Sequence, residues 1–152
     1  MAPVRDQTVR GIMNLFVANA HLLDAFERIT MRAGLSYAAF NVLRILRGHP
    51  EGHPRRVIAE RLVTMNADVT RLVDGLVRRG LVRRARSSSD RRLSLARITP
   101  KGVAVLAELD PLIGTFVEEY RGRLSTAKWT ELGRLLEAVY GPEVERKMER
   151  EG

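Results

Sequence analysis

The middle of the chain, residues 54–101, restricts the possible folds because turn residues divide it into short segments of different periodicity. Two stretches place apolar residues at helical spacing, and Gly80 ends the second of them. Two strand-like runs follow on either side of a turn cluster at 87–90, and they should pair as a hairpin. The expected elements are helix 55–62, helix 66–79, strand 81–86 and strand 93–98.

Longer helices are expected on both sides of this middle segment. Upstream, apolar residues recur at helical spacing over 7–32, and Ser36 caps the next helix. Downstream, Thr99 and Pro100 begin a long helix, and the Ser-Thr pair at 125–126 caps a last one. The sequence therefore predicts a mainly α fold with one small β-hairpin, in a chain of the size of one ordinary domain.

Positive charge is concentrated in the same middle segment. Residues 54–101 contain thirteen basic and four acidic side chains, a net charge of +9, whereas the whole chain carries +8. A nearly neutral body with one basic block indicates a polyanionic partner. The block contains no aromatic residue on which unpaired bases could stack, and this favours double-stranded over single-stranded nucleic acid.

The second helix of the middle segment has one face suited to a DNA groove. On a helical wheel of about 100° per residue, its aliphatic residues cluster on one side, and Arg71 and Arg78 lie roughly opposite. Arg71 could bond guanine O6 and N7 bidentately, and Thr70 could meet a thymine methyl group or a phosphate. An ordinary solvated helix would show the same amphipathic pattern. The neighbouring elements favour DNA, since a short helix, a turn, a second helix and a hairpin form the order of a winged helix-turn-helix.

The segment after this helix resembles the wing signature of the MarR family of bacterial transcriptional regulators. It reads Asp90-Arg91-Arg92-Leu93-Ser94-Leu95-Ala96-Arg97-Ile98-Thr99-Pro100-Lys101-Gly102. Residues 69–82 are similar to the recognition helix of that family and the strand after it. The resemblance implies that Arg92 enters the minor groove, that Asp90 shapes the wing tip, and that Thr70 and Arg71 face the major groove. The expected DNA-binding residues are Asn66, Ala67, Asp68, Thr70, Arg71, Asp74, Arg78, Arg86, Asp90, Arg91 and Arg92.

One of these positions departs from the family pattern. Asp68 is acidic where relatives commonly have small polar or amide residues. A carboxylate suits the positive end of the helix dipole, but it repels phosphate unless it accepts a hydrogen bond from a cytosine N4. The base preference at this position therefore stays open.

The resemblance also implies a homodimer and a small-molecule effector. One MarR-like domain over 1–152 would comprise a reading head at about 36–100 and dimerisation helices at about 7–32 and 100–147. Two-fold symmetry would place the recognition helices about 34 Å apart on a pseudo-palindromic operator. An ordinary core without a partner is the alternative. Relatives often bind small aromatic or phenolic anions between head and dimerisation helices, for which the expected lining here is Phe16, Ala20, His21, Phe40 and Arg44.

Several other classes of function are not indicated. The chain has no cysteine, which excludes disulfides and thiol sensing, and its three histidines form no convincing metal cluster, so we expect no metal and no cofactor. It contains no phosphate-binding glycine loop, HExxH or G-x-S-x-G motif, so we expect no enzyme. No signal peptide or membrane span is visible, and we expect a cytoplasmic protein, by family default a repressor. The alternative function is a non-specific architectural or membrane-surface basic binding protein.

Overall fold

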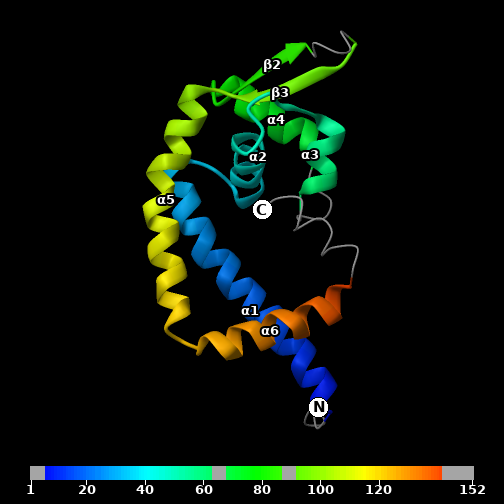
Figure 1. Cartoon of the computed structure of the whole chain (residues 1–152), viewed down its shortest axis with the longest axis vertical. Helices are drawn as coiled ribbons and strands as arrows, with labels where there is room; N and C mark the ends of the chain where they lie inside the picture. Colours follow the sequence, from blue (N-terminus) through cyan, green and yellow to red (C-terminus); the bar gives the residue numbers. More distant parts are fainter. Residues whose placement is uncertain (1–5, 63–67, 87–91, 142–152) are drawn as a thin grey trace.

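The computed structural model describes residues 6–62, 68–86 and 92–141. Two long helices lie side by side and form a stem with a third helix at its far end, while the remaining elements form a head at the other end (Figure 1). The stem comprises α1 (Gln7–Thr30), α5 (Pro100–Arg121) and α6 (Thr126–Tyr140), and a 3-10 turn, η1 (Met31–Ala33), follows α1. The head comprises α2 (Tyr37–Arg47), β1 (His53–Pro54), α3 (Arg55–Arg61), α4 (Val69–Arg78), β2 (Val82–Arg86) and β3 (Ser94–Ile98).

Side-chain caps determine where most of these helices begin. The predicted starts are confirmed at Ser36, whose Oγ accepts from the Ala39 N–H at 3.2 Å, and at Thr99, whose Oγ1 accepts from the Gly102 N–H at 3.1 Å. The predicted start of α4 near residue 66 is corrected to Val69. The residue before it, Asp68, is the N-cap, since a carboxylate accepts well from the unpaired N–H groups of a first turn.

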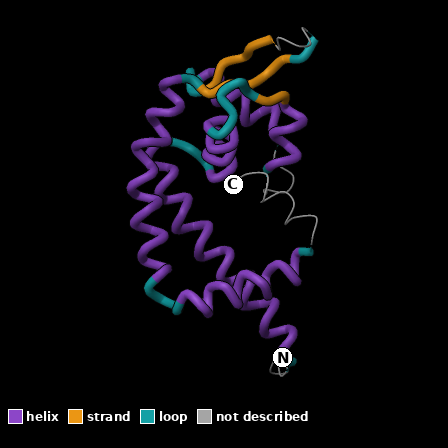
Figure 2. Tube along the Cα trace, viewed as in Figure 1, coloured by secondary structure: helices purple, strands orange, loops and turns teal. Residues whose placement is uncertain are grey.

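The strands form one antiparallel sheet in the order β1-β3-β2 at the head end of the molecule (Figure 2). The predicted hairpin is confirmed, with Val82 paired to Ile98 at one end of β2 and Arg86 paired to Ser94 at the other. The edge strand β1 was not predicted. It depends on Gly52, whose φ is 87° and where an added Cβ would lie 2.5 Å from the Ala96 carbonyl oxygen. Only glycine permits this close approach of the loop to β3.

The buried apolar core lies in the head and in the adjoining half of α5. The residues that exclude solvent most completely include Leu35, Val42, Leu43, Leu46, Ile58, Leu76, Leu81, Leu106 and Leu109. Among the described residues, α6 buries none of its side chains and α1 buries only Thr30. Within the described ranges, the far half of the stem therefore leaves most of its side chains exposed. No helix in the described ranges has both the length and the apolar content that a membrane span requires.

Candidate nucleic-acid interface

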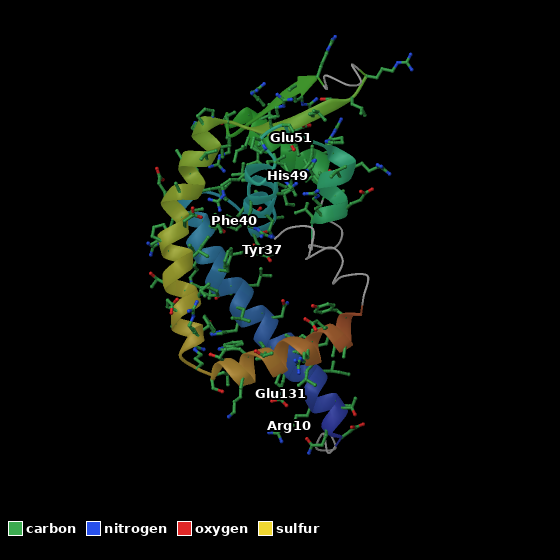
Figure 3. All side chains as sticks on the ribbon, viewed as in Figure 1. Arg10, Tyr37, Phe40, His49, Glu51 and Glu131 are labelled. Atoms are coloured by element: carbon green, nitrogen blue, oxygen red, sulfur yellow. The ribbon has the colours of Figure 1, made fainter. Side chains whose placement is uncertain are left out.

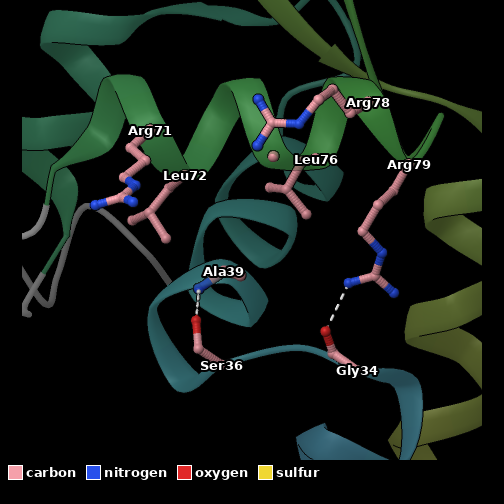
Figure 4. Close-up of a pocket in the computed structure, with 9 residues that line it drawn as sticks. Gly34, Ser36, Ala39, Arg71, Leu72, Leu76, Arg78 and Arg79 are labelled. Atoms are coloured by element: carbon pink, nitrogen blue, oxygen red, sulfur yellow. Dashed lines mark hydrogen bonds between the residues drawn. The ribbon is translucent and has the colours of Figure 1, made fainter.

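The recognition helix α4 has one buried and one exposed face. Val73 and Leu76 are each 2% exposed and pack into the core of the head. Thr70, Arg71 and Arg78 are exposed. Figure 4 shows Leu76 pointing from α4 toward α2, while the Arg78 side chain extends alongside α4 itself. The charged face predicted from the helical wheel is thus the face that the head leaves open to a partner.

A hydrogen bond joins α4 to the preceding helix. The Arg55 Nη1 donates to the Thr70 Oγ1 at 3.3 Å, and both residues are exposed. The bond fixes the hydroxyl of Thr70 near the beginning of α4, beside the exposed Arg71. It also brings the charge of Arg55 to the same end of the helix, where the first N–H groups already favour an anion.

Both acidic residues at α4 have partners inside the head. The Asp68 Oδ1 accepts from the Arg71 backbone N–H at 3.1 Å. Asp74 forms an ion pair with Arg84 of β2, in which the Asp74 side chain is only 35% exposed. The carboxylates therefore cap the helix and join it to the sheet. Asp68 and Asp74, two of the acids predicted as DNA contacts, thus have structural partners that explain their presence on a surface rich in arginine.

The strands of the wing lie at the same end of the molecule as α4, opposite α6 (Figure 1). Arg86 ends β2, Arg92 lies two residues before β3, and both side chains are exposed. The other expected DNA-binding residues of the wing and of the α3–α4 connection lie outside the described residues; these are Asn66, Ala67, Asp90 and Arg91. The described basic side chains of the helix and the wing thus lie at one end of the molecule.

A groove of about 830 Å³ lies between the head and the stem. Its lining combines aromatic rings with a few polar groups, and the rings of Tyr37, Phe40 and Phe116 each meet Phe26 edge-on at 5.4–5.6 Å. Tyr37 and Phe40 lie toward the beginning of α2 (Figure 3). The lining residues are Asn19, Leu22, Leu23, Phe26, Tyr37, Phe40, Asn41, Arg44, Ile113 and Phe116.

The groove includes only part of the lining that the sequence predicts. Phe40 and Arg44 line it, whereas Phe16, Ala20 and His21 are exposed and are not among its lining residues. The side of α1 that contains Asn19 and Phe26 faces the groove. His21 follows Asn19 by two residues, about 200° around the helix, so it faces away from the groove. Phe16 lies on nearly the same side of α1 as Leu23, but it precedes Asn19, the first α1 residue of the groove, by almost one turn. Helical periodicity therefore identifies this face of α1 but not how far along it the groove extends.

Two histidines meet an arginine where α2, β1 and α3 join. The rings of His49 and His53 have centroids 4.3 Å apart, and the Arg61 Nη1 lies 2.9 Å from the His49 Nε2. The His49 Nδ1 is 3.2 Å from the Ile45 carbonyl oxygen, so it donates there while Nε2 accepts from Arg61. Among the described residues, the buried His53 Nε2 has no hydrogen-bond partner. The unpaired nitrogen and the neighbouring guanidinium favour the neutral form of His53.

The environment of His53 makes the stability of the head depend on pH. Burial lowers the pKa of His53 below its ordinary value of 6.5, and the charges of Arg61 and His49 lower it further, against a smaller opposing effect of Glu51. A group whose pKa is lower in the folded state binds its proton more readily after unfolding. Its stabilising contribution is therefore complete above about pH 6.5 and decreases as the pH falls toward the folded pKa.

We expect His53→Gln to reduce the loss of unfolding free energy between pH 7.5 and pH 5. Urea denaturation of the two proteins at both pH values measures the difference. His21→Gln is the matched control, because it removes an exposed imidazole outside the head. If wild type and His53→Gln lose the same free energy on acidification, the imidazole does not contribute to the pH dependence.

The chain is similar to characterised transcriptional regulators. A model described as MarR family matches residues 33–93. The HTH-type transcriptional regulator MhqR of Bacillus subtilis is 33% identical over 104 residues, which are 63% of this chain and 71% of that protein. The solved MarR transcription factor of Planctomyces limnophilus is 33% identical with a TM-score of 0.66, over 86% of this chain and 96% of that one.

Two solved structures of proteins named CouR, one of them described as a transcriptional repressor, have the same fold. CouR bound to a 23-mer DNA duplex is 26% identical with a TM-score of 0.79, over 93% of this chain and 99% of that one. CouR from Rhodococcus jostii RHA1 bound to p-coumaroyl-CoA is 23% identical with a TM-score of 0.75, over 91% of this chain and 96% of that one. The outer helices, for which the sequence pattern is least specific, are thus included in the structural likeness.

Proposed function

Because this chain belongs to the MarR family, we propose that it is a homodimeric transcriptional repressor whose binding to a pseudo-palindromic operator responds to a small molecule. The observation that carries this function is the placement of an exposed arginine face on α4 at the same end of the molecule as a basic wing. Such a helix fits the major groove of duplex DNA, and such a wing reaches the adjacent minor groove. The protein would act in the cytoplasm, where the bacterial chromosome lies.

We assign different roles to the residues of the interface. Thr70, Arg71 and Arg78 would contact bases or phosphates in the major groove, and Arg86 and Arg92 would contact the minor groove and its phosphates. Asp68 and Asp74 would act indirectly, by capping α4 and by joining it to β2. Direct contacts by Asn66, Ala67, Asp90 and Arg91 stay predictions from the sequence.

The apolar surface of the stem supports the homodimer. Large apolar side chains that are at least 41% exposed in the single chain occur on all three stem helices; among them are Val9, Ile12, Met13, Phe16 and Val17 of α1, Val103 and Val117 of α5, and Leu135 and Val139 of α6. Many large apolar side chains left exposed on neighbouring helices indicate an interaction site. With head residues 36–100 left outside this interface, two heads would reach half-sites about one DNA turn apart.

The groove between stem and head supports a small aromatic effector. Its rings suit an aromatic ligand, and Arg44 supplies a positive charge at the same wall. CouR from Rhodococcus jostii RHA1, which has the same fold, has been solved with p-coumaroyl-CoA. A ligand here would contact α1, α2 and α5 together and so could bias the position of the head relative to the stem.

A salt titration against three partners tests the function. Fluorescence anisotropy measures binding of the purified protein to duplex fragments of its source genome and to single strands. Sedimentation measures its binding to anionic vesicles. We expect one set of duplex fragments to bind most tightly, with an affinity that falls roughly 10³–10⁵-fold between 50 and 200 mM salt if six to ten phosphates are contacted. Equal binding to every duplex would favour an architectural protein, and preference for vesicles a membrane-surface protein.

A further inference from the structure

Arg79, at the end of the recognition helix, holds two backbone carbonyl groups with both arms of its guanidinium. The Nη1 donates to the Gly34 carbonyl oxygen at 2.6 Å, and the Nη2 donates to the Ala33 carbonyl oxygen at 2.6 Å. Figure 4 shows the Arg79 side chain extending from α4 to Gly34. These carbonyls belong to the segment between α1 and α2. One side chain therefore connects α4 to the junction of stem and head, 45 residues away in the sequence.

The geometry of this contact suits arginine in particular. Carbonyl groups at the end of a helical segment carry partial negative charge, and a planar guanidinium can meet two of them at once. The backbone at Gly34 has a φ of 64°, and an added Cβ would lie 3.5 Å from the Arg79 Nη2. The turn and the guanidinium are thus closely packed. Because both of its arms are directed at carbonyl groups, the guanidinium points toward the stem junction.

The other side of the same backbone is fixed to the stem. The Arg79 carbonyl oxygen accepts from the Lys101 Nζ at 3.0 Å, and the Gly80 carbonyl oxygen accepts from the Thr99 Oγ1 at 2.7 Å. Thr99 and Lys101 form the beginning of α5. The end of α4 is therefore held from two directions, by the α1–α2 junction through a side chain and by α5 through carbonyl groups.

The residues on either side of this junction reach the groove between stem and head. Phe26 and Tyr37 line the groove, and they lie on either side of the α1–α2 junction in the sequence. The Glu27 Oε1 accepts from the Tyr37 N–H at 3.5 Å, which joins the same two helices beside the aromatic contact. A change in the relative position of α1 and α2 would move the carbonyls that Arg79 holds.

We propose that Arg79 is a positioning residue, which sets the orientation of α4 relative to the stem and transmits movements of the α1–α2 junction to the DNA-reading face. This inference rests on the proposed DNA-binding function. It assigns to Arg79 a role different from that of its neighbour Arg78, although both belong to the basic block. Arg78 would contact DNA directly, whereas Arg79 would act through the position of the whole helix.

Two measurements on Arg79→Ala, Arg79→Lys and Arg78→Ala test the proposal. In the DNA-free protein, we expect Arg79→Ala to speed hydrogen exchange of the backbone amides in 73–81 while those of α6 keep their wild-type rates. On a duplex that the wild type binds, Arg79→Ala should lower the affinity about tenfold, with an unchanged slope of log K against log salt. Arg79→Lys should recover part of both effects, because an ammonium can still donate to one of the carbonyls. Arg78→Ala should lower the salt slope by about one and leave the exchange unchanged.

Three results would overturn the proposal. A slope lowered by about one in Arg79→Ala, with wild-type exchange, would mean that Arg79 contacts a phosphate. If Arg79→Ala has wild-type hydrogen exchange and wild-type affinity, the contact does not position α4. If exchange becomes faster throughout the head, the substitution has caused a general loss of stability. If the wild type binds no duplex, the proposed function fails, and the exchange measurement still decides whether Arg79 holds α4.

Discussion

Leu135→Asp is expected to convert the protein from a dimer into monomers and to lower its operator affinity by roughly 10²–10⁴-fold. Leu135 of α6 is 59% exposed in the single chain, so the monomer tolerates a charge there. In a dimer that covers this face, the same carboxylate would be buried without a partner, at a cost of several kcal/mol. A monomer binds the DNA with one reading head and loses the gain in affinity that a linked second head provides. Sedimentation equilibrium and duplex titration measure the two effects.

Thr130→Asp is the matched control for this substitution. It places the same charge on nearly the opposite side of α6, because five residues correspond to about 500° of helical rotation. Thr130 is exposed and donates to the Thr126 carbonyl oxygen at 3.0 Å, a bond within its own helix. We expect Thr130→Asp to remain dimeric and to bind DNA as the wild type does. A dimeric Leu135→Asp protein would place the association surface elsewhere on the stem.

The parts of the fold that depend on neighbouring residues could be predicted from the sequence. Caps at Ser36 and Thr99 and the hairpin involve groups that are close along the chain, and the residue types alone indicate them. The beginning of α4 was placed too early because two residues in this stretch, Asn66 and Asp68, can both cap a helix. The strand β1 was missed because its two residues become a strand only by pairing with β3.

The sequence predicted which face of α4 is exposed, but it did not predict which side chains contact each other in the site. Helical periodicity identified the outward side of α4, since its opposite side is strongly aliphatic. The partners of Asp74 and Arg79 lie 10 and 45 residues away in the sequence, where no local pattern connects them. The α1 side of the groove gave a different difficulty. Phe16 and Leu23 share one apolar face of α1, and helical periodicity does not show how far along this face the groove extends.

Arg71→Ala is expected to cost roughly 1–3 kcal/mol of binding free energy on the operator and much less on unrelated duplexes. Arg71 is exposed in the first turn of α4, and its own backbone N–H is capped by Asp68. A guanidinium that bonds guanine O6 and N7 loses both bonds on truncation, and only where guanine is present. Titrations of the operator, of operators with single base changes and of random duplex measure this difference.

Comparison with two further variants separates base contact from phosphate contact. Arg71→Lys retains the charge and loses the planar fork, so it should keep the affinity for random duplex while discrimination between operators falls. Arg92→Ala should weaken binding and remove the preference for A·T-rich flanks, because an arginine in the wing recognises the width of the minor groove and not the base edges. If Arg71→Ala instead weakens binding to every duplex equally and lowers the slope of log K against log salt by about one, Arg71 contacts a phosphate. Base discrimination would then have to come from other residues of α4 or from the shape of the DNA.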